Sequence, residues 1–139
     1  MKRHGLWVLV LTGCAAFSAI AQTASANIAE VDGSATDAQL ISPIINLQGR
    51  IDTYISFSWF IKTELDSGEY LAFDISQDGG TTWIELRRLD GNVGPENTWR
   101  DEILDGVWGP AGTMRLRFRG KMSGVEEDAY IDNVRVIAQ

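Results

Sequence analysis

Hydrophobic and polar residues alternate along several short segments of the chain, and this period of two predicts β-strands. The clearest example is the segment 53–63, and the same pattern recurs in the segments 71–75 and 114–118. In a half-buried strand, alternate side chains point to one face of the sheet, so the apolar set should lie inside. We therefore expect a core that contains Ile55, Phe57, Trp59, Ile61, Leu71, Phe73, Ile75, Met114, Leu116 and Phe118.

The segment 70–89 predicts a β-hairpin. Its two apolar runs are separated by Asp78, Gly79 and Gly80, a turn cluster in which glycine accepts a positive φ and aspartate bonds the backbone ahead of it. Residues 76–83 also match the Asp-box pattern S-x-D-x-G-x-T-W. We expect the Asp78 carboxylate to accept turn N–H groups and Trp83 to pack over the turn, which is a structural role and not a catalytic one.

Turn-rich segments separate the remaining predicted strands. Residues 40–47 are typical of an edge strand. Pro43 has no N–H and cannot donate a hydrogen bond to a neighbouring strand, so a central strand would not tolerate it well. Residues 99–104 and 130–137 predict two further strands. The segment 64–69 should turn through Ser67 and Gly68. About seven short strands without a helical period favour an all-β fold, an antiparallel two-sheet sandwich.

The order of these motifs resembles the MAM-type jelly roll, in a cysteine-free form similar to bacterial exported modules, with the Asp-box hairpin in its middle. The resemblance covers residues 39–136 and implies two antiparallel sheets in a jelly roll, with a role in adhesion or binding and not in catalysis. It is carried by the motifs Leu40-Ile41-Ser42-Pro43, Ile55-Ser56-Phe57-Ser58-Trp59, the glycine-flanked strand 68–76, Trp99 and Tyr130-Ile131-Asp132-Asn133-Val134.

The first 26 residues are typical of an export signal. Lys2 and Arg3 precede an apolar run over residues 6–20, and small residues at 19–21 and 24–26 offer cleavage sites. We expect a secreted or periplasmic protein without a membrane span, divided into a signal segment (1–26), a flexible lead-in or first strand (27–38) and a β-sandwich binding domain (39–139). Alternatively, residues 11–14 resemble a bacterial lipobox, in which Cys14 would carry a lipid anchor in the outer membrane.

Composition narrows the chemistry of the mature domain. Cys14 and His4 are the only cysteine and histidine, and both lie in the signal segment. Loss of that segment excludes a Ser-His-Asp triad, a cysteine nucleophile and a zinc site built from His or Cys. It also leaves ten cationic against 19 acidic residues, a net charge of −9, which disfavours nucleic acid and anionic membranes as partners.

One carboxylate pattern suggests an enzyme. Glu64, Asp66 and Glu69 fit the E-x-D-x-x-E signature of laminarinase-type glycoside hydrolases. Retaining hydrolysis needs its two carboxyl groups about 5–5.5 Å apart, whereas Ser67 and Gly68 place a turn between them here. We therefore expect no enzymatic activity and keep a small glycoside hydrolase as the least favoured alternative.

The expected ligand contacts are aromatic and cationic. Trp99 begins a strand and Trp108 lies in a Gly/Pro loop, where either ring could stack on a sugar or a partner protein. Arg115, Arg117 and Arg119 share one strand face, which suits an anionic ligand or, alternatively, cross-strand carboxylate partners. The sequence thus predicts an exported, non-catalytic module for a cell-surface protein or polysaccharide, with a carbohydrate-binding module as the alternative.

Acidic residues near the first and last strands suggest a structural calcium ion, since hard cations prefer oxygen ligands. No other cofactor is expected. The carboxylates available for this ion are Asp32, Asp37, Asp128 and Asp132.

Overall fold

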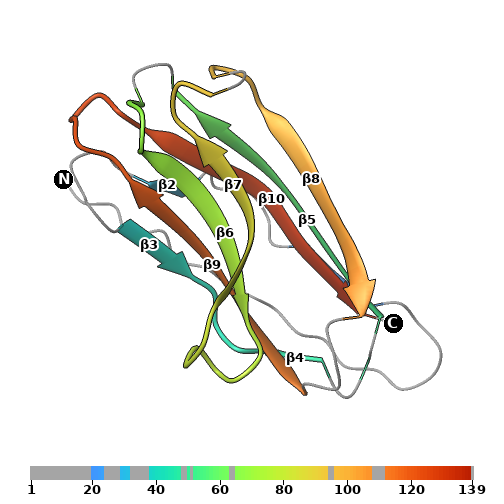
Figure 1. The fold of residues 1–139 in the computed structure, drawn as a ribbon. Coiled ribbons are helices and arrows are strands. Elements are labelled where there is room, and N and C mark those ends of the chain that lie inside the picture. Colours follow the sequence, from blue (N-terminus) through green and yellow to red (C-terminus); the bar gives the residue numbers. More distant parts are fainter. Residues whose placement is uncertain are drawn as a thin grey trace.

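The computed structural model describes residues 20–23, 29–31, 38–47, 50, 52–62, 65–93, 96–107 and 112–138, and it confirms the all-β prediction. The strands pair antiparallel in two packed sheets (Figure 1). Their bounds are β1 Ile20–Thr23, β2 Ala29–Val31, β3 Ala38–Ile41, β4 Ile45–Asn46, β5 Asp52–Ile61, β6 Tyr70–Ser76, β7 Ile84–Asp90, β8 Arg100–Val107, β9 Thr113–Lys121 and β10 Ala129–Ala138.

One sheet has the order β1-β10-β5-β8, with β2 also pairing with β10. The other has the order β3-β9-β6-β7, with β4 also pairing with β9. Consecutive strands therefore change sheet after β2, β4, β5, β7, β8 and β9. The connections after β5, β7 and β9 lie at the same end of the sandwich (Figure 1). The β6–β7 hairpin turns at the opposite end.

The core lies between the sheets and includes the residues that alternation predicted, together with Ile45, Leu47, Leu65, Leu89, Leu104, Met122, Ala129 and Ile131. All ten expected core residues are buried. Phe57 is at their centre, with ring centroids 5.2 Å from Trp59, 4.6 Å from Phe73 and 5.0 Å from Phe118. Edge-to-face and tilted ring pairs of this kind add to the stabilisation that burial alone supplies.

The segment 40–47 is an edge of its sheet, as Pro43 predicted, but it is interrupted. Ser42 pairs with Leu116 through both its backbone N–H and its hydroxyl, each at 2.9 Å, and the ladder then stops until Ile45. Pro43 cannot donate to β9, so β3 and β4 form two short strands in place of one.

The β6–β7 turn has the hydrogen bonds expected of Asp78. Its carboxylate accepts the backbone N–H groups of Thr81 and Thr82 at 2.9 Å, and the hydroxyls of Ser76 and Thr82. These bonds, the Thr82 hydroxyl first among them, hold the pKa of Asp78 far below its usual range. Gly79 and Gly80 take φ values of 80° and 104°, which a side chain would strain.

Two short strands lie in the N-terminal part of the chain. β1 falls within the segment predicted as an export signal and β2 within the predicted lead-in, and both pair with β10. Cys14 lies outside the described residues, so its predicted lipidation stays a prediction. Within the described part of the chain, no helix is long and apolar enough to cross a membrane.

Candidate functional site

A row of three aromatic side chains crosses the outer face of the β10-β5-β8 sheet. Tyr130 on β10 pairs directly with Phe60 on β5, and Trp99 immediately precedes β8, next to the Arg100–Trp59 pair. The ring centroids of Phe60 and Trp99 lie 5.5 Å apart, and those of Phe60 and Tyr130 lie 5.9 Å apart. We call Tyr130, Phe60 and Trp99 the aromatic row.

Strand alternation explains why this row faces outward. Trp59 and Ile61 on β5 are buried in the core, so Phe60 between them points away from it. Tyr130 likewise lies between two buried residues of β10. Trp99 is 45% exposed, which leaves much of its indole open to solvent. The row therefore offers an apolar surface on the outside of the sheet.

Polar groups border the aromatic row on the same face. A second row lies two residues further along the strands from the aromatic row and contains Asp132, Ser58 and Asp101. In this row the Ser58 hydroxyl donates a hydrogen bond to the Asp101 carboxylate, at 2.7 Å. On the other side of the aromatic row, the Tyr130 hydroxyl donates a hydrogen bond to the Asp128 carboxylate, at 3.2 Å. Asp128 also forms an ion pair with Lys62. This face combines ring surface with hydrogen-bonding oxygens, and we call it the aromatic face.

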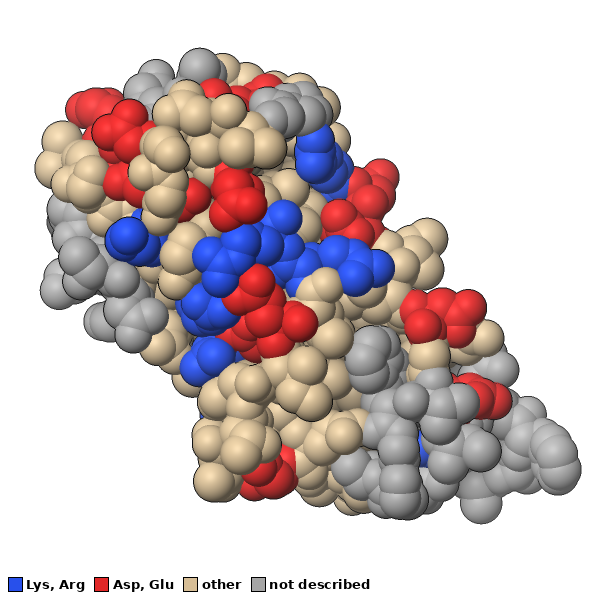
Figure 2. Space-filling view, in the orientation of Figure 1, with Lys and Arg blue, Asp and Glu red and all other residues tan. Residues whose placement is uncertain are grey.

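The outer face of the other sheet is cationic. Arg115, Arg117 and Arg119 lie on one side of β9, as the sequence predicted, while Leu116 and Phe118 between them are buried. Figure 2 shows blue side chains gathered over β6, β7 and β9, intermixed with red ones. We call this surface the arginine face; it comprises Tyr70, Asp74, Trp83, Glu85, Arg88, Arg115, Arg117 and Arg119.

Two carboxylates form ion pairs with arginines of this face. Asp74 on β6 is 1% exposed, and one of its oxygens accepts the Nε–H groups of Arg117 and Arg119, both at 2.7 Å. Glu85 pairs with Arg88 and Arg119, and its hydrogen bond from Arg88 is the main reason why its pKa lies below the ordinary value. These are the cross-strand acidic partners that the sequence left open as an alternative.

The aromatic rings of the arginine face are covered by guanidinium groups. The Arg88 guanidinium lies 3.8 Å from the centre of the Tyr70 ring, and that of Arg117 lies 4.3 Å from the Trp83 ring. Such cation–π contacts fix the arginines in place. Trp83 also donates its indole N–H to Gly80 at 3.1 Å, so it packs at the hairpin turn as expected.

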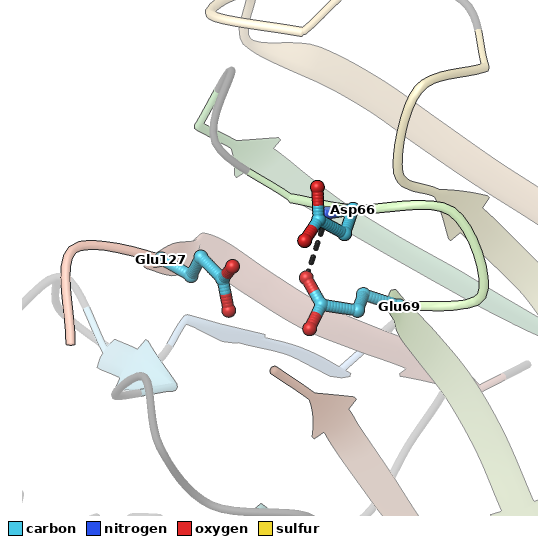
Figure 3. A group of neighbouring side chains, drawn as sticks. All are labelled: Asp66, Glu69 and Glu127. Atoms are coloured by element: carbon cyan, nitrogen blue, oxygen red, sulfur yellow. Dashed lines mark hydrogen bonds between the residues drawn. The ribbon is translucent and has the colours of Figure 1, made fainter. Parts of the chain in front are cut away.

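Three carboxylates meet where the β5–β6 and β9–β10 connections approach each other (Figure 3). One ligand oxygen from each of Asp66, Glu69 and Glu127 lies within 4.8 Å of the other two. Glu69 accepts the Asp66 amide at 2.7 Å, and Glu127 accepts the Ser123 amide at 2.6 Å. Each glutamate thus accepts a backbone N–H from its own loop and stabilises the conformation of that loop.

Burial raises the pKa of Glu69, but hydrogen bonds from the Ser123 hydroxyl and the Asp66 amide outweigh it, so the net pKa lies below its ordinary value. Asp66 and Glu69 flank a turn at Ser67–Gly68, as predicted, and Glu64 lies outside the described residues. Carboxylate oxygens of this kind are the ligands that calcium uses.

The four aspartates named for calcium are not this group. Asp128 pairs with Lys62, and Asp132 accepts the backbone N–H of Asn133 at 2.7 Å. Asp32 and Asp37 lie outside the described residues, as does Trp108 among the expected ligand contacts. The calcium site therefore stays a prediction.

Sequence reasoning named Trp99 but missed its two aromatic neighbours. The signal for Phe60 was present, because alternation places it on the outward side of β5 with Tyr54, Ser56 and Ser58. The pairing of Phe60 with Tyr130 depends on strand order, which alternation does not specify.

Comparisons with known proteins give structural likeness alone. No protein-family profile matches the sequence, and no curated protein matches it. Among solved structures, the chain is similar to TmCBM61 in complex with β-1,4-galactotriose, with a TM-score of 0.53 and 11% identity over 87% of this chain and 70% of that one. It is also similar to a family 16 carbohydrate-binding module, with a TM-score of 0.52 and 11% identity over 84% of each chain. At this identity, the likeness shows that the chain has the β-sandwich fold of these modules.

Proposed function

We propose that the protein is an exported, non-catalytic module that binds a neutral polysaccharide on its aromatic face. The observation that carries this proposal is the aromatic row, in which Tyr130 on β10, Phe60 on β5 and Trp99 just before β8 lie side by side. A pyranose ring presents C–H groups on its faces and hydroxyls at its rim. It can therefore pack against an aromatic ring while its hydroxyls bond to polar neighbours.

The neighbours of the row have the oxygens that such hydroxyls need. Asp101 and Asp132 lie one pleat repeat away from the row on the same face, at about 7 Å along each strand. Ionised carboxylates accept two hydroxyl donors and bind them more strongly than neutral oxygens do. They also repel uronates and sulfates, so this face favours an uncharged glycan.

The solved structures with this fold support the same class of function, because both are carbohydrate-binding modules and one contains a bound β-1,4-galactotriose. A binding role also agrees with the environment of Asp66 and Glu69. These carboxylates lie on either side of a turn, and Glu69 is engaged by the Asp66 amide. The aromatic face needs no reacting group to bind a sugar.

A panel of neutral polysaccharides, tested by affinity electrophoresis and then by calorimetry, measures this function. We expect the wild-type protein to bind at least one of them and Trp99→Ala to weaken that binding about tenfold or more, the usual effect of removing an aromatic anchor. Tyr54→Ala is the matched control, because this ring is 38% exposed on the same face but distant from the row. Equal binding by wild type and Trp99→Ala would contradict the proposal.

A protein partner is the second candidate, and a different part of the face favours it. Ile103 on β8 is 72% exposed, and Tyr54 lies diagonally across from it on β5. Both side chains offer exposed apolar surface, and the pair is bordered by Asp105, which lies directly opposite Tyr54. A partner protein held by these residues would be lost with Ile103→Ser and retained with Trp99→Ala, the reverse of the glycan result.

A further inference from the structure

We infer that Arg115 and Arg117 form a second binding site, on the arginine face, which takes carboxylate groups of an acidic polysaccharide. The two sheets place this site on the side of the sandwich opposite to the aromatic face. The inference is independent of the proposed function, because it uses different residues and a ligand of different charge.

Hydrogen-bond donors distinguish these two arginines from Arg119. The Arg119 guanidinium is used by Asp74, Glu85 and the Tyr70 hydroxyl. Arg117 donates only its Nε–H, so within the described residues both of its Nη groups have no hydrogen-bond acceptor. Arg115 bonds to the carbonyl oxygens of Ser42 at 3.0 Å and Gly79 at 3.4 Å, and its Nη2 has none there.

These open donors belong to side chains that are already held in place. The Arg117 guanidinium lies over the Trp83 ring and is anchored at Nε by the buried Asp74. Arg115 is anchored by two backbone carbonyls, one of them in the β6–β7 turn. A ligand therefore finds ordered guanidinium groups and does not have to immobilise them, which lowers the entropic cost of binding.

The spacing and charge of the pair indicate the class of ligand. Residues two apart on a strand repeat at about 7 Å, so each guanidinium can meet a separate anionic group. Carboxylate is the planar partner that the guanidinium fork bonds through two oxygens. Four arginines and two carboxylates make this face positive, although the whole chain has a net charge of −7.

The overall negative charge disfavours dense polyanions such as nucleic acid, because their many charges would feel the field of the whole protein. A short oligouronate can lie over this face alone, so it meets the local positive excess and little of the negative field over the rest of the protein. Asp78 in the adjacent turn does not compete strongly for the arginines, because its carboxylate is engaged by Ser76, Thr81 and Thr82.

Calorimetry with an oligogalacturonate tests this site. We expect wild type to bind and Arg115→Gln or Arg117→Gln to bind about tenfold more weakly, the loss expected for a charge-assisted hydrogen bond. Arg87→Gln is the matched control, because it removes the same charge from an exposed arginine that pairs with Glu102 on β8. Complete methyl esterification of the oligosaccharide should abolish binding.

Folding does not confound the result. Arg115→Gln leaves no carboxylate unpaired, because Arg115 bonds only to backbone carbonyls, and its thermal unfolding should match wild type. Trp99→Ala should retain full oligogalacturonate binding even where it loses a neutral glycan, which separates the two sites. The inference is wrong if wild type does not bind the oligogalacturonate. It is also wrong if Arg115→Gln binds as tightly as wild type and the Arg87→Gln control do.

Discussion

On the outer face of the β10-β5-β8 sheet, aromatic rings lie against each other and remain accessible, whereas on the arginine face they lie beneath guanidinium groups. Tyr130 and Tyr70 illustrate the difference. Tyr130 packs beside Phe60, while the Tyr70 ring is covered by Arg88 and its hydroxyl accepts from Arg119. The same residue type is a surface for a ligand in one sheet and a support for charged groups in the other. The neighbours across the strands decide which.

Both faces depend on the core beneath them, so the largest expected effect is common to both. Trp59 is fully buried and packs edge-to-face on Phe57. We expect Trp59→Ala to lower the free energy of unfolding by about 3–5 kcal/mol, the usual cost of removing a large buried aromatic. Denaturant unfolding measures it, and a loss below about 1 kcal/mol would place Trp59 outside the core.

The arginine face should depend on one buried carboxylate. Asp74→Ala leaves Arg117 and Arg119 without their shared acceptor, so we expect a loss of about 3 kcal/mol, at the lower end for a broken buried ion pair because the arginines reach solvent. Equilibrium unfolding compares this variant with Glu102→Ala, whose ion pair with Arg87 is more exposed. Equal losses in the two variants would show that Asp74 does not organise the face.

We expect the aromatic face to tolerate loss of Trp99 better than the arginine face tolerates loss of Asp74. Trp99 is partly exposed and makes its described ring contact with Phe60 alone. We expect Trp99→Ala to cost less than about 1 kcal/mol in the free energy of unfolding, as surface substitutions usually do. The same denaturation experiment measures it. A loss as large as that of Asp74→Ala would make Trp99 a structural residue and remove the contrast between the faces.

The smallest expected effect is a pH dependence of stability that comes from Glu69, in the connection between β5 and β6. The pKa of Glu69 is lowered in the folded protein, so its ionised form stabilises the fold above its unfolded pKa of about 4.5. That contribution is lost as pH falls through the folded pKa. We expect the melting temperature of wild type to fall more than that of Glu69→Gln between pH 6 and pH 3. Parallel curves would show that Glu69 has no such role.

The pattern of the chain determined the strands, their inward faces and the local chemistry of the Asp78 turn. These features depend on residues one to eight positions apart, and period-two alternation and turn propensity act at that range. Sequence reasoning therefore predicted the core around Phe57 and Trp59, and placed three arginines on one side of β9.

Only the tertiary structure decided what each outward side chain meets. Phe60 and Tyr130 are 70 positions apart, and they join because β5 and β10 are neighbours in one sheet. Asp74 becomes the partner of Arg117 and Arg119 through the pairing of β6 with β9, and Glu69 meets Glu127 because two loops share one end of the sandwich. Strand order and register produce these contacts. They result from the packing of the whole core, so no local pattern specifies them.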